Sequence, residues 1–161
     1  MPATAASCPS LRRVERRARL IGVNHVALEV GDLDAALALY GRLFDFELRG
    51  RVPGAAFIDM GDQFIALMAG RRQPADDQRH FGLVVDDVAA VRAAVEREGL
   101  EIIHPGARGL DFADPWGNHF QIVAYEAVQF ERSDGVKRKL GIQELAKSPA
   151  ARHEIAERGL A

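Results

Sequence analysis

Two histidines in this chain stand 55 positions apart, each at the head of an apolar stretch. His25 opens the run His25-Val26-Ala27-Leu28-Glu29-Val30, and His80 opens the run His80-Phe81-Gly82-Leu83-Val84-Val85. Imidazole is a common metal ligand and carries protons near neutral pH. Two histidines at matching places therefore indicate a shared metal-binding or proton-transfer site. The alternative is two hydrogen-bonded histidines in a half-buried sheet.

The match between the two stretches continues along the chain at the same spacing of 55. Val30 corresponds to Val85, Asp32 to Asp87, Phe57 to Phe112 and Asp59 to Asp114. A fixed period that spans several patterns is typical of a repeated supersecondary unit. We predict two copies of one unit, with the two histidines at equivalent positions.

The first unit, predicted over residues 21–70, has the pattern β-α-β-β-β. Strands are expected over 21–30, 46–51, 54–60 and 63–69, where β-branched and aliphatic residues cluster between turns. The helix follows Asp32, whose carboxylate can accept from free N–H groups of the first turn. Its apolar residues recur at helical spacing over 33–44 and give one buried face.

The second unit, predicted over residues 79–126, repeats this order. Strands are expected over 79–85, 100–104, 108–113 and 118–125, with a helix that begins after Asp87 and ends at Gly99. Residues 1–20 form a polar, Arg-rich tail, and residues 127–161 form a helical extension. Within that extension, helices are expected over 136–146 and after Ser148-Pro149.

Composition excludes several classes of protein. With 48% hydrophobic and 27% charged residues, the 161-residue chain is typical of a globular protein. A net charge of -2 argues against nucleic acid as a partner, and no apolar run is long enough to cross a membrane. The single cysteine, Cys8, allows no internal disulfide, which fits a cytoplasmic location.

The turn Asp114-Pro115-Trp116-Gly117-Asn118, followed by the strand pattern His119-Phe120-Gln121-Ile122, adds a more specific signal. Together with the two leading histidines and the Asp-led helices, this region resembles the vicinal oxygen chelate superfamily. That superfamily includes glyoxalase I, bleomycin-resistance and fosfomycin-resistance proteins, methylmalonyl-CoA epimerase and extradiol dioxygenases. The resemblance covers residues 21–126. It implies an α+β fold in which two tandem βαβββ modules form a U-shaped, partly open, barrel-like cleft of mixed sheet.

The resemblance also implies a ligand set for a divalent metal ion at four corners, the first and last strand of each module. Here those corners are His25, Ala66, His80 and Gln121. The metal ligands are therefore expected to be His25, His80 and Gln121, and the ion to be Fe, Zn, Ni, Mn or Co. Gln121 stands where relatives carry Glu, which keeps an oxygen donor but removes a charge. Some glyoxalase I enzymes use Gln as a ligand.

His119 lies two residues before Gln121 and so on the same strand face. We expect it to be the catalytic residue, as a general base near neutral pH, with roles as a substrate donor or substitute ligand left open. The alternative is a solvent-exposed histidine at the rim of the cleft. In the first module, Phe64, Ala66 and Met68 share a face and predict an apolar floor.

Two functions follow from the resemblance. The first is a metal-dependent enzyme acting on a small oxygen-bearing substrate, with lyase or isomerase chemistry favoured over dioxygenase chemistry because the carboxylate ligand is missing. The alternative is a metal-free protein that binds a small molecule, as bleomycin-resistance proteins sequester an antibiotic. The resemblance also implies a homodimer.

Overall fold

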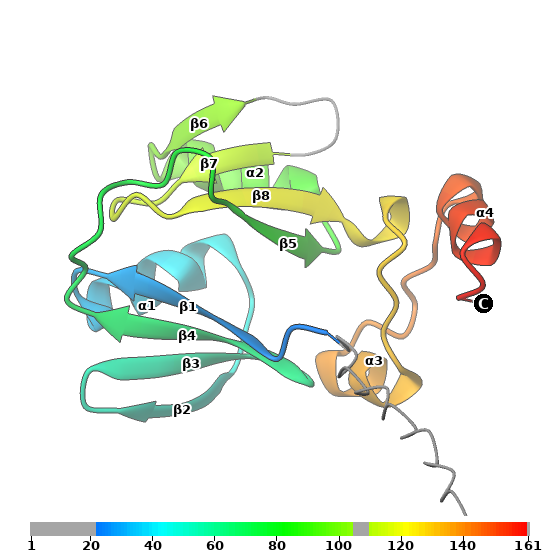
Figure 1. The fold of residues 1–161 in the computed structure, drawn as a ribbon, viewed down its shortest axis with the longest axis horizontal. Helices are drawn as coiled ribbons and strands as arrows, with labels where there is room; N and C mark the ends of the chain where they lie inside the picture. Colours follow the sequence, from blue (N-terminus) through cyan, green and yellow to red (C-terminus); the bar gives the residue numbers. More distant parts are fainter. Residues whose placement is uncertain (1–21, 105–109, 161) are drawn as a thin grey trace, which may run out of the picture.

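Two βαβββ modules stand side by side in the structure, a computed structural model that describes residues 22–104 and 110–160. Each module builds a separate four-stranded mixed sheet, with strand orders β1-β4-β3-β2 and β5-β8-β7-β6. Edge strands β1 and β5 face each other across the junction, and both helices lie behind the sheets (Figure 1). The sheets do not close into a barrel, so the predicted α+β fold with a partly open cleft is confirmed.

Module one contains β1 (His25–Val30), α1 (Leu33–Leu43), β2 (Leu48–Val52), β3 (Ala55–Met60) and β4 (Gln63–Ala69). Helix α1 begins as predicted, since the Asp32 carboxylate accepts a hydrogen bond of 2.8 Å from the Ala35 N–H. The turns after β2 and β3 use Gly54 and Gly61, both at positive φ, a conformation that glycine adopts without steric cost.

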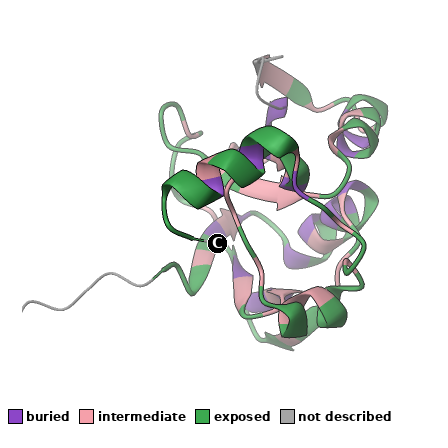
Figure 2. Cartoon of the chain, turned by 90° about the vertical axis from the view of Figure 1, so that its right-hand side faces the viewer, coloured by how far each residue is buried: buried purple, intermediate pink, exposed green. Residues whose placement is uncertain are grey.

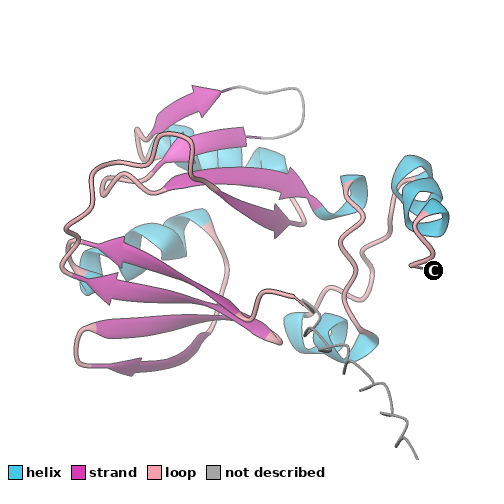
Figure 3. Cartoon of the chain, in the orientation of Figure 1, coloured by secondary structure: helices cyan, strands magenta, loops and turns pink. Residues whose placement is uncertain are grey.

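Module two contains β5 (Phe81–Val85), α2 (Val88–Arg97), β6 (Glu101–His104), β7 (Leu110–Ala113) and β8 (His119–Ala124). Asp87 caps α2 through the Ala90 N–H, and Gly99 follows the helix at positive φ, as the sequence predicts. In both modules the first strand pairs in parallel with the last, and the other pairs are antiparallel. Figure 3 shows the same order of strand and helix in each half.

The two modules share one apolar core, and the predicted turn at residues 114–118 closes it at one end. The buried Asp114 carboxylate accepts from the Tyr40 hydroxyl of module one at 2.6 Å, and from the backbone N–H groups of Trp116 and Asn118 at 2.9 and 2.8 Å. Burial and the Asp114 charge raise the pKa of Tyr40 far above its usual range, so its hydroxyl stays a donor. This turn therefore joins the modules through buried hydrogen bonds.

The C-terminal extension crosses the open end of the junction (Figure 1). It contains a 3-10 turn η1 (Tyr125–Ala127) and the helices α3 (Asp134–Leu140) and α4 (Pro149–Glu157). The expected helix over 136–146 is wrong in length. Helix α3 ends at Leu140, because the next residue, Gly141, has a left-handed backbone conformation that terminates the helix. The helix after Ser148-Pro149 is confirmed, with the Ser148 hydroxyl as its cap. Figure 2 views the molecule from the side of the extension and shows that the outer surfaces of α3 and α4 are exposed.

No helix among the described residues is both long and apolar enough to cross a membrane. The expected N-terminal tail and Cys8 lie outside the described residues.

Candidate functional site

His25 begins β1 on the face of the sheet opposite the core. Its ring stacks on Phe64 of the neighbouring strand, with centroids 4.7 Å apart and planes 12° apart. Nδ1 lies 3.0 Å from the side-chain oxygen of Asn24. An amide oxygen only accepts, so Nδ1 carries the hydrogen and Nε2 carries the lone pair. His25 is exposed, so Nε2 is accessible to a ligand.

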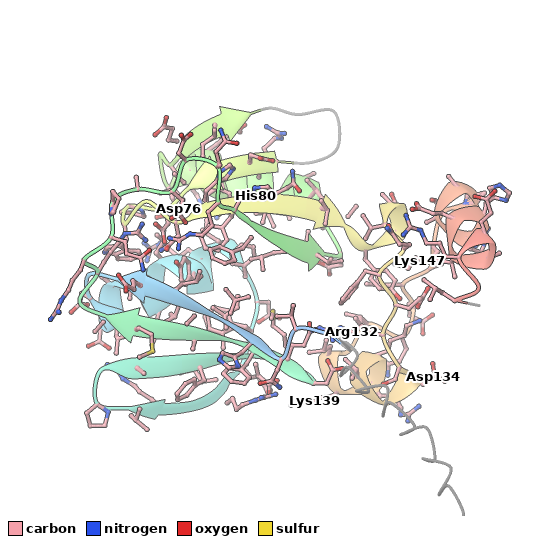
Figure 4. All side chains as sticks on the ribbon, viewed as in Figure 1. Asp76, His80, Arg132, Asp134, Lys139 and Lys147 are labelled. Carbon is pink, nitrogen blue, oxygen red and sulfur yellow. The ribbon has the colours of Figure 1, made fainter. Side chains whose placement is uncertain are left out.

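His80 lies immediately before β5, at the equivalent place in module two (Figure 4). Its Nδ1 is 3.2 Å from the backbone carbonyl oxygen of Gln78. A carbonyl oxygen also accepts only, which again places the lone pair on Nε2. The two repeated histidines thus share one tautomer, each fixed by a neighbour that precedes it in the chain.

His119 differs from both, because it is buried, with 6% of its surface exposed. This burial contradicts the alternative that His119 is a solvent-exposed histidine at the rim of the cleft. Its Nε2 lies 3.1 Å from the Asp111 carboxylate, which is itself buried, and donates to it. Its Nδ1 is buried and has no hydrogen-bond partner among the described residues. A buried acceptor without a partner is costly and is therefore a place to look for a ligand or a transferred proton.

The β7–β8 pairing explains how Asp111 reaches His119. Asp111 is opposite Gln121 and Ala113 is opposite His119, so Asp111 reaches diagonally along one face of the sheet. The ring of His80 lies on that face too, with its centroid 5.3 Å from that of His119. Three groups that can hold or accept protons are therefore gathered on module two: Asp111, His119 and His80.

Asp111 is the functional residue that sequence reasoning missed. A signal was present, because a carboxylate stands between Leu110 and Phe112 in a strand predicted to be buried. Buried acidic residues are rare without a partner. Asp111 meets its partner, His119, through the pairing register of β7 and β8, and the sequence pattern alone does not determine that register.

Gln121 lies on the same strand face as His119, opposite Gly82 on one side and Asp111 on the other. The corresponding residue of module one, Ala66, is buried and offers no donor. The structure thus places Gln121 beside His119 and Asp111. His25 comes instead from the other module, on the far side of the junction between β1 and β5.

A cavity of about 380 Å³ lies at that junction and is lined by both His25 and His80, together with Phe64, Phe81 and Phe120. Its described lining does not include Gln121 or His119. The structure therefore brings His25 and His80 to one cavity, and brings His80, His119 and Gln121 to one sheet face. His80 belongs to both groups.

The donor set fits a divalent metal ion in its chemistry. Metal-binding histidines use one ring nitrogen as ligand and donate the other N–H to an oxygen acceptor, which is the arrangement found at His25 and His80. Two imidazoles bound to one ion would have ring centroids roughly 4.5–5.2 Å apart for nitrogen–metal bonds of about 2.1 Å. The His80 and His119 rings are close to this spacing at 5.3 Å, but His119 Nε2 is taken by Asp111, so this pair is not counted among the expected ligands.

No three His, Cys, Asp or Glu side chains converge as a preformed metal site in residues 22–104 and 110–160. That count leaves out amide oxygens, and Gln121 supplies one. The residues present therefore offer two histidines and an amide rather than a complete set of charged or imidazole ligands.

Trp116 and two arginines of β2 have structural contacts. Trp116 packs against the backbone of Gly31 and edge-on to Tyr40, so it belongs to the junction between the modules. Arg51 pairs with Asp34, and Arg49 lies over the ring of Phe64 and 3.5 Å from Asp59.

Comparisons with known proteins agree with this fold. A family model, Glyoxalase/Bleomycin resistance protein/Dioxygenase superfamily, matches residues 22–122. A lactoylglutathione lyase structure from Agrobacterium tumefaciens is 26% identical, with a TM-score of 0.54 over 70% of this chain and 100% of that chain. The fosfomycin resistance protein FosX from Mesorhizobium loti is 21% identical, with a TM-score of 0.57 over 65% and 92%.

A third structure, a variant of FosX from Listeria monocytogenes, is in complex with Mn(II) and 1S,2S-dihydroxypropylphosphonic acid. It is 18% identical, with a TM-score of 0.57 over 65% of this chain and 90% of that chain. The family model covers more than half of the sequence, and the two βαβββ modules have the architecture expected from it. The chain belongs to the glyoxalase/bleomycin resistance protein/dioxygenase superfamily.

Proposed function

We propose that this protein is a divalent-metal-dependent enzyme, a lyase or isomerase, that acts on a small oxygen-bearing substrate. The observation that carries the proposal is His119, a buried imidazole held by Asp111 with its second nitrogen unpaired. A side chain oriented in this way is what general base catalysis requires. The Mn(II) complex of a FosX relative supports the presence of a metal in this fold.

In this proposal His119 accepts a substrate proton at Nδ1, while Asp111 acts as a positioning residue. The Asp111 carboxylate fixes the Nε2–H tautomer and then stabilises the positive charge that the ring acquires. Both groups are already buried, so little reorganisation accompanies the charge change.

The metal ligands in this proposal are His25 and His80 through Nε2 and Gln121 through its amide oxygen. A bound divalent ion would supply Lewis-acid polarisation of substrate oxygens. The aromatic rings of Phe64, Phe81 and Phe120 line the histidine cavity and favour an organic ligand. The identity of the ion, among Fe, Zn, Ni, Mn and Co, is for loading experiments to decide.

The alternative is a metal-free binding protein that sequesters a small molecule in the same cavity. Two observations favour it: Gln121 replaces a charged ligand, and no preformed set of three His, Cys, Asp or Glu side chains is found in the described chain. The two proposals differ in whether ligand binding and turnover need a metal.

The first experiment is elemental analysis of untagged protein, followed by loading with each candidate ion. We expect about one equivalent of one metal, lost in both His25→Ala and His80→Ala, since losing one of three ligands weakens binding strongly. His153→Ala is the matched control, because His153 is an exposed histidine on α4 that pairs only with Glu157. Unchanged metal content in both site variants would reject the ligand set.

His119 is tested separately by His119→Phe, which introduces the residue that module one carries at the equivalent place, Phe64. We expect metal content to stay and turnover to fall by roughly 10²–10⁴-fold. Lactoylglutathione and fosfomycin, named for two relatives, are the first compounds to assay. If tight binding of a compound is unaffected by chelator and no turnover is found, the binding protein is the better description.

We also propose that the protein is a cytoplasmic homodimer, as the family resemblance and the lack of a disulfide suggest. Sedimentation equilibrium of the full chain measures the oligomeric state directly.

A further inference from the structure

A second and larger cavity, of about 680 Å³, lies next to the histidine cavity between the two modules. Apolar side chains that line both cavities are Leu28, Met60, Ile65, Leu83, Phe120 and Phe130. The two spaces therefore adjoin each other and share these side chains. Cavities of roughly 300–1,000 Å³ with mainly apolar walls are typical of small-molecule sites.

Comparison of the repeated strands shows where this space comes from. In module one, the core residues Leu28 and Val30 are 2% and 0% exposed. Their counterparts in module two, Leu83 and Val85, are only half-buried, and both line the larger cavity. The same sequence pattern is thus packed in one module and left uncovered in the other.

The C-terminal extension forms one wall of this cavity, through Phe130, Leu140, Ile142 and Leu145. It is held by bonds to module one and by bonds within the extension. Towards module one, Arg132 bonds to Asp62, Gln63 and the Met60 carbonyl, and Lys139 pairs with Asp59. Figure 4 shows Arg132 and Lys139 on the side of α3 that faces module one.

Within the extension itself, Lys147 donates to the carbonyl oxygens of Tyr125, Val128 and Phe130, which follow β8 directly. The wall is therefore part of the folded structure rather than a loose tail. It gives the cavity a side that the two modules alone do not supply.

The charged groups that line the cavity determine which ligand charge it can accommodate. Four aspartates line it, Asp45, Asp59, Asp86 and Asp87, of which Asp59 pairs with Lys139, and the cation of its described lining, Arg132, is already paired with Asp62. An anionic group would be repelled here and would leave water without a new partner. The cavity therefore suits an uncharged chain or ring.

We propose that this cavity holds the uncharged alkyl or aryl tail of the substrate, while the oxygen-bearing head lies with His25 and His80. This inference rests on the proposed function and assigns its substrate class: a molecule with a polar head and an extended apolar tail. The C-terminal extension is the wall that accommodates the tail.

Isothermal titration of the full chain with 2-hydroxyalkanoates, from 2-hydroxybutanoate to 2-hydroxytetradecanoate, tests the assignment. We expect affinity to rise by about fourfold for each buried methylene until the cavity is filled. Val85→Trp and Leu145→Trp fill the cavity from the sheet and from the extension, and both should abolish this gain with chain length. Val52→Trp, at an exposed strand position, is the matched control and should keep the full gain.

An affinity that does not change with chain length would overturn the assignment. So would a full gain in affinity with chain length in both cavity-filling variants, provided that circular dichroism shows both to be folded. Repeating the series with chelator separates this inference from the proposed function. A gain with chain length that survives chelator, with no metal bound under any loading, retains the tail site and rejects the metal-dependent enzyme. Metal-dependent binding without chain-length dependence does the reverse.

Discussion

The two modules place the same first-strand histidine on different neighbours. In module one, His25 stacks on Phe64. In module two, the residue equivalent to Phe64 is His119, beside His80, and the residue equivalent to Ala56 is Asp111, which holds His119. Module one thus keeps an apolar version of the arrangement, and module two carries ionisable side chains in its place. The repeat supplies the backbone frame, and two substitutions in one copy supply the ionisable groups.

A second difference concerns the equivalent aspartates Asp59 and Asp114, each of which precedes the last strand of its module. Asp114 is buried and serves the Tyr40 hydroxyl and three nitrogen donors of the turn. Its counterpart, Asp59, accepts from the Gly61 N–H and pairs with Lys139 of the extension. The same residue therefore joins the modules in one copy and attaches the C-terminal extension in the other.

Replacing these two aspartates should give the largest contrast. Asp114→Ala leaves buried donors unpaired and should lower the free energy of unfolding by about 3 kcal/mol. Asp59→Ala removes an ion pair with a half-exposed lysine and should cost about 1 kcal/mol or less. Urea unfolding followed by fluorescence measures both. Equal losses would show that the two aspartates are equivalent after all.

The core valines of β1 and β5 form the next comparison. Val30→Ala should cost about 2–3 kcal/mol, because a fully buried side chain leaves a cavity. Val85→Ala should cost less than about 1 kcal/mol, since this side chain already borders open space. The difference in urea midpoint between the two variants checks this. A Val85→Ala loss as large as that of Val30→Ala would contradict the open cavity.

The smallest expected effect on stability is that of acid on the ion pair between Asp59 and Lys139, which attaches the extension to module one. Burial alone would raise the pKa of Asp59, but hydrogen bonds from Lys139 and the Gly61 N–H outweigh it and lower the pKa below the ordinary value of 3.8. A lowered folded pKa means that the stabilisation is present above the unfolded pKa and is lost as pH falls through the folded value.

We therefore expect the stability difference between wild type and Asp59→Asn, about 1 kcal/mol or less near neutral pH, to shrink as the pH falls below 3.8 and through the lowered pKa of Asp59. Thermal unfolding of both proteins across this range measures the difference. A gap that persists at the lowest pH would assign the stabilisation to a group other than this carboxylate.

Periodicity and turn residues predicted the fold well, because each module depends on local signals. The caps at Asp32 and Asp87, and the order of strands and helices, follow from side chains that act on their own neighbours. The apolar pattern overestimates the length of α3, because Gly141 adopts a left-handed conformation and ends the helix.

The candidate site was predictable only in part. The spacing of 55 found His25 and His80, and strand alternation put His119 and Gln121 on one face. Asp111 and the burial of His119 depend on strand register, and the larger cavity depends on how two sheets and an extension meet. No single stretch of sequence encodes these long-range contacts.

Lys147 gives the extension a chemical reporter of its own motion. Its ammonium group is buried beneath three carbonyl oxygens and lies 3.5 Å from the centre of the Tyr125 ring, and burial lowers its pKa. An acylating reagent can reach this amine only after the segment around it has detached, whereas Lys139 on α3 is half-exposed. The ratio of their labelling rates, read by mass spectrometry, therefore reports how often Lys147 separates from residues 125–130 within the extension.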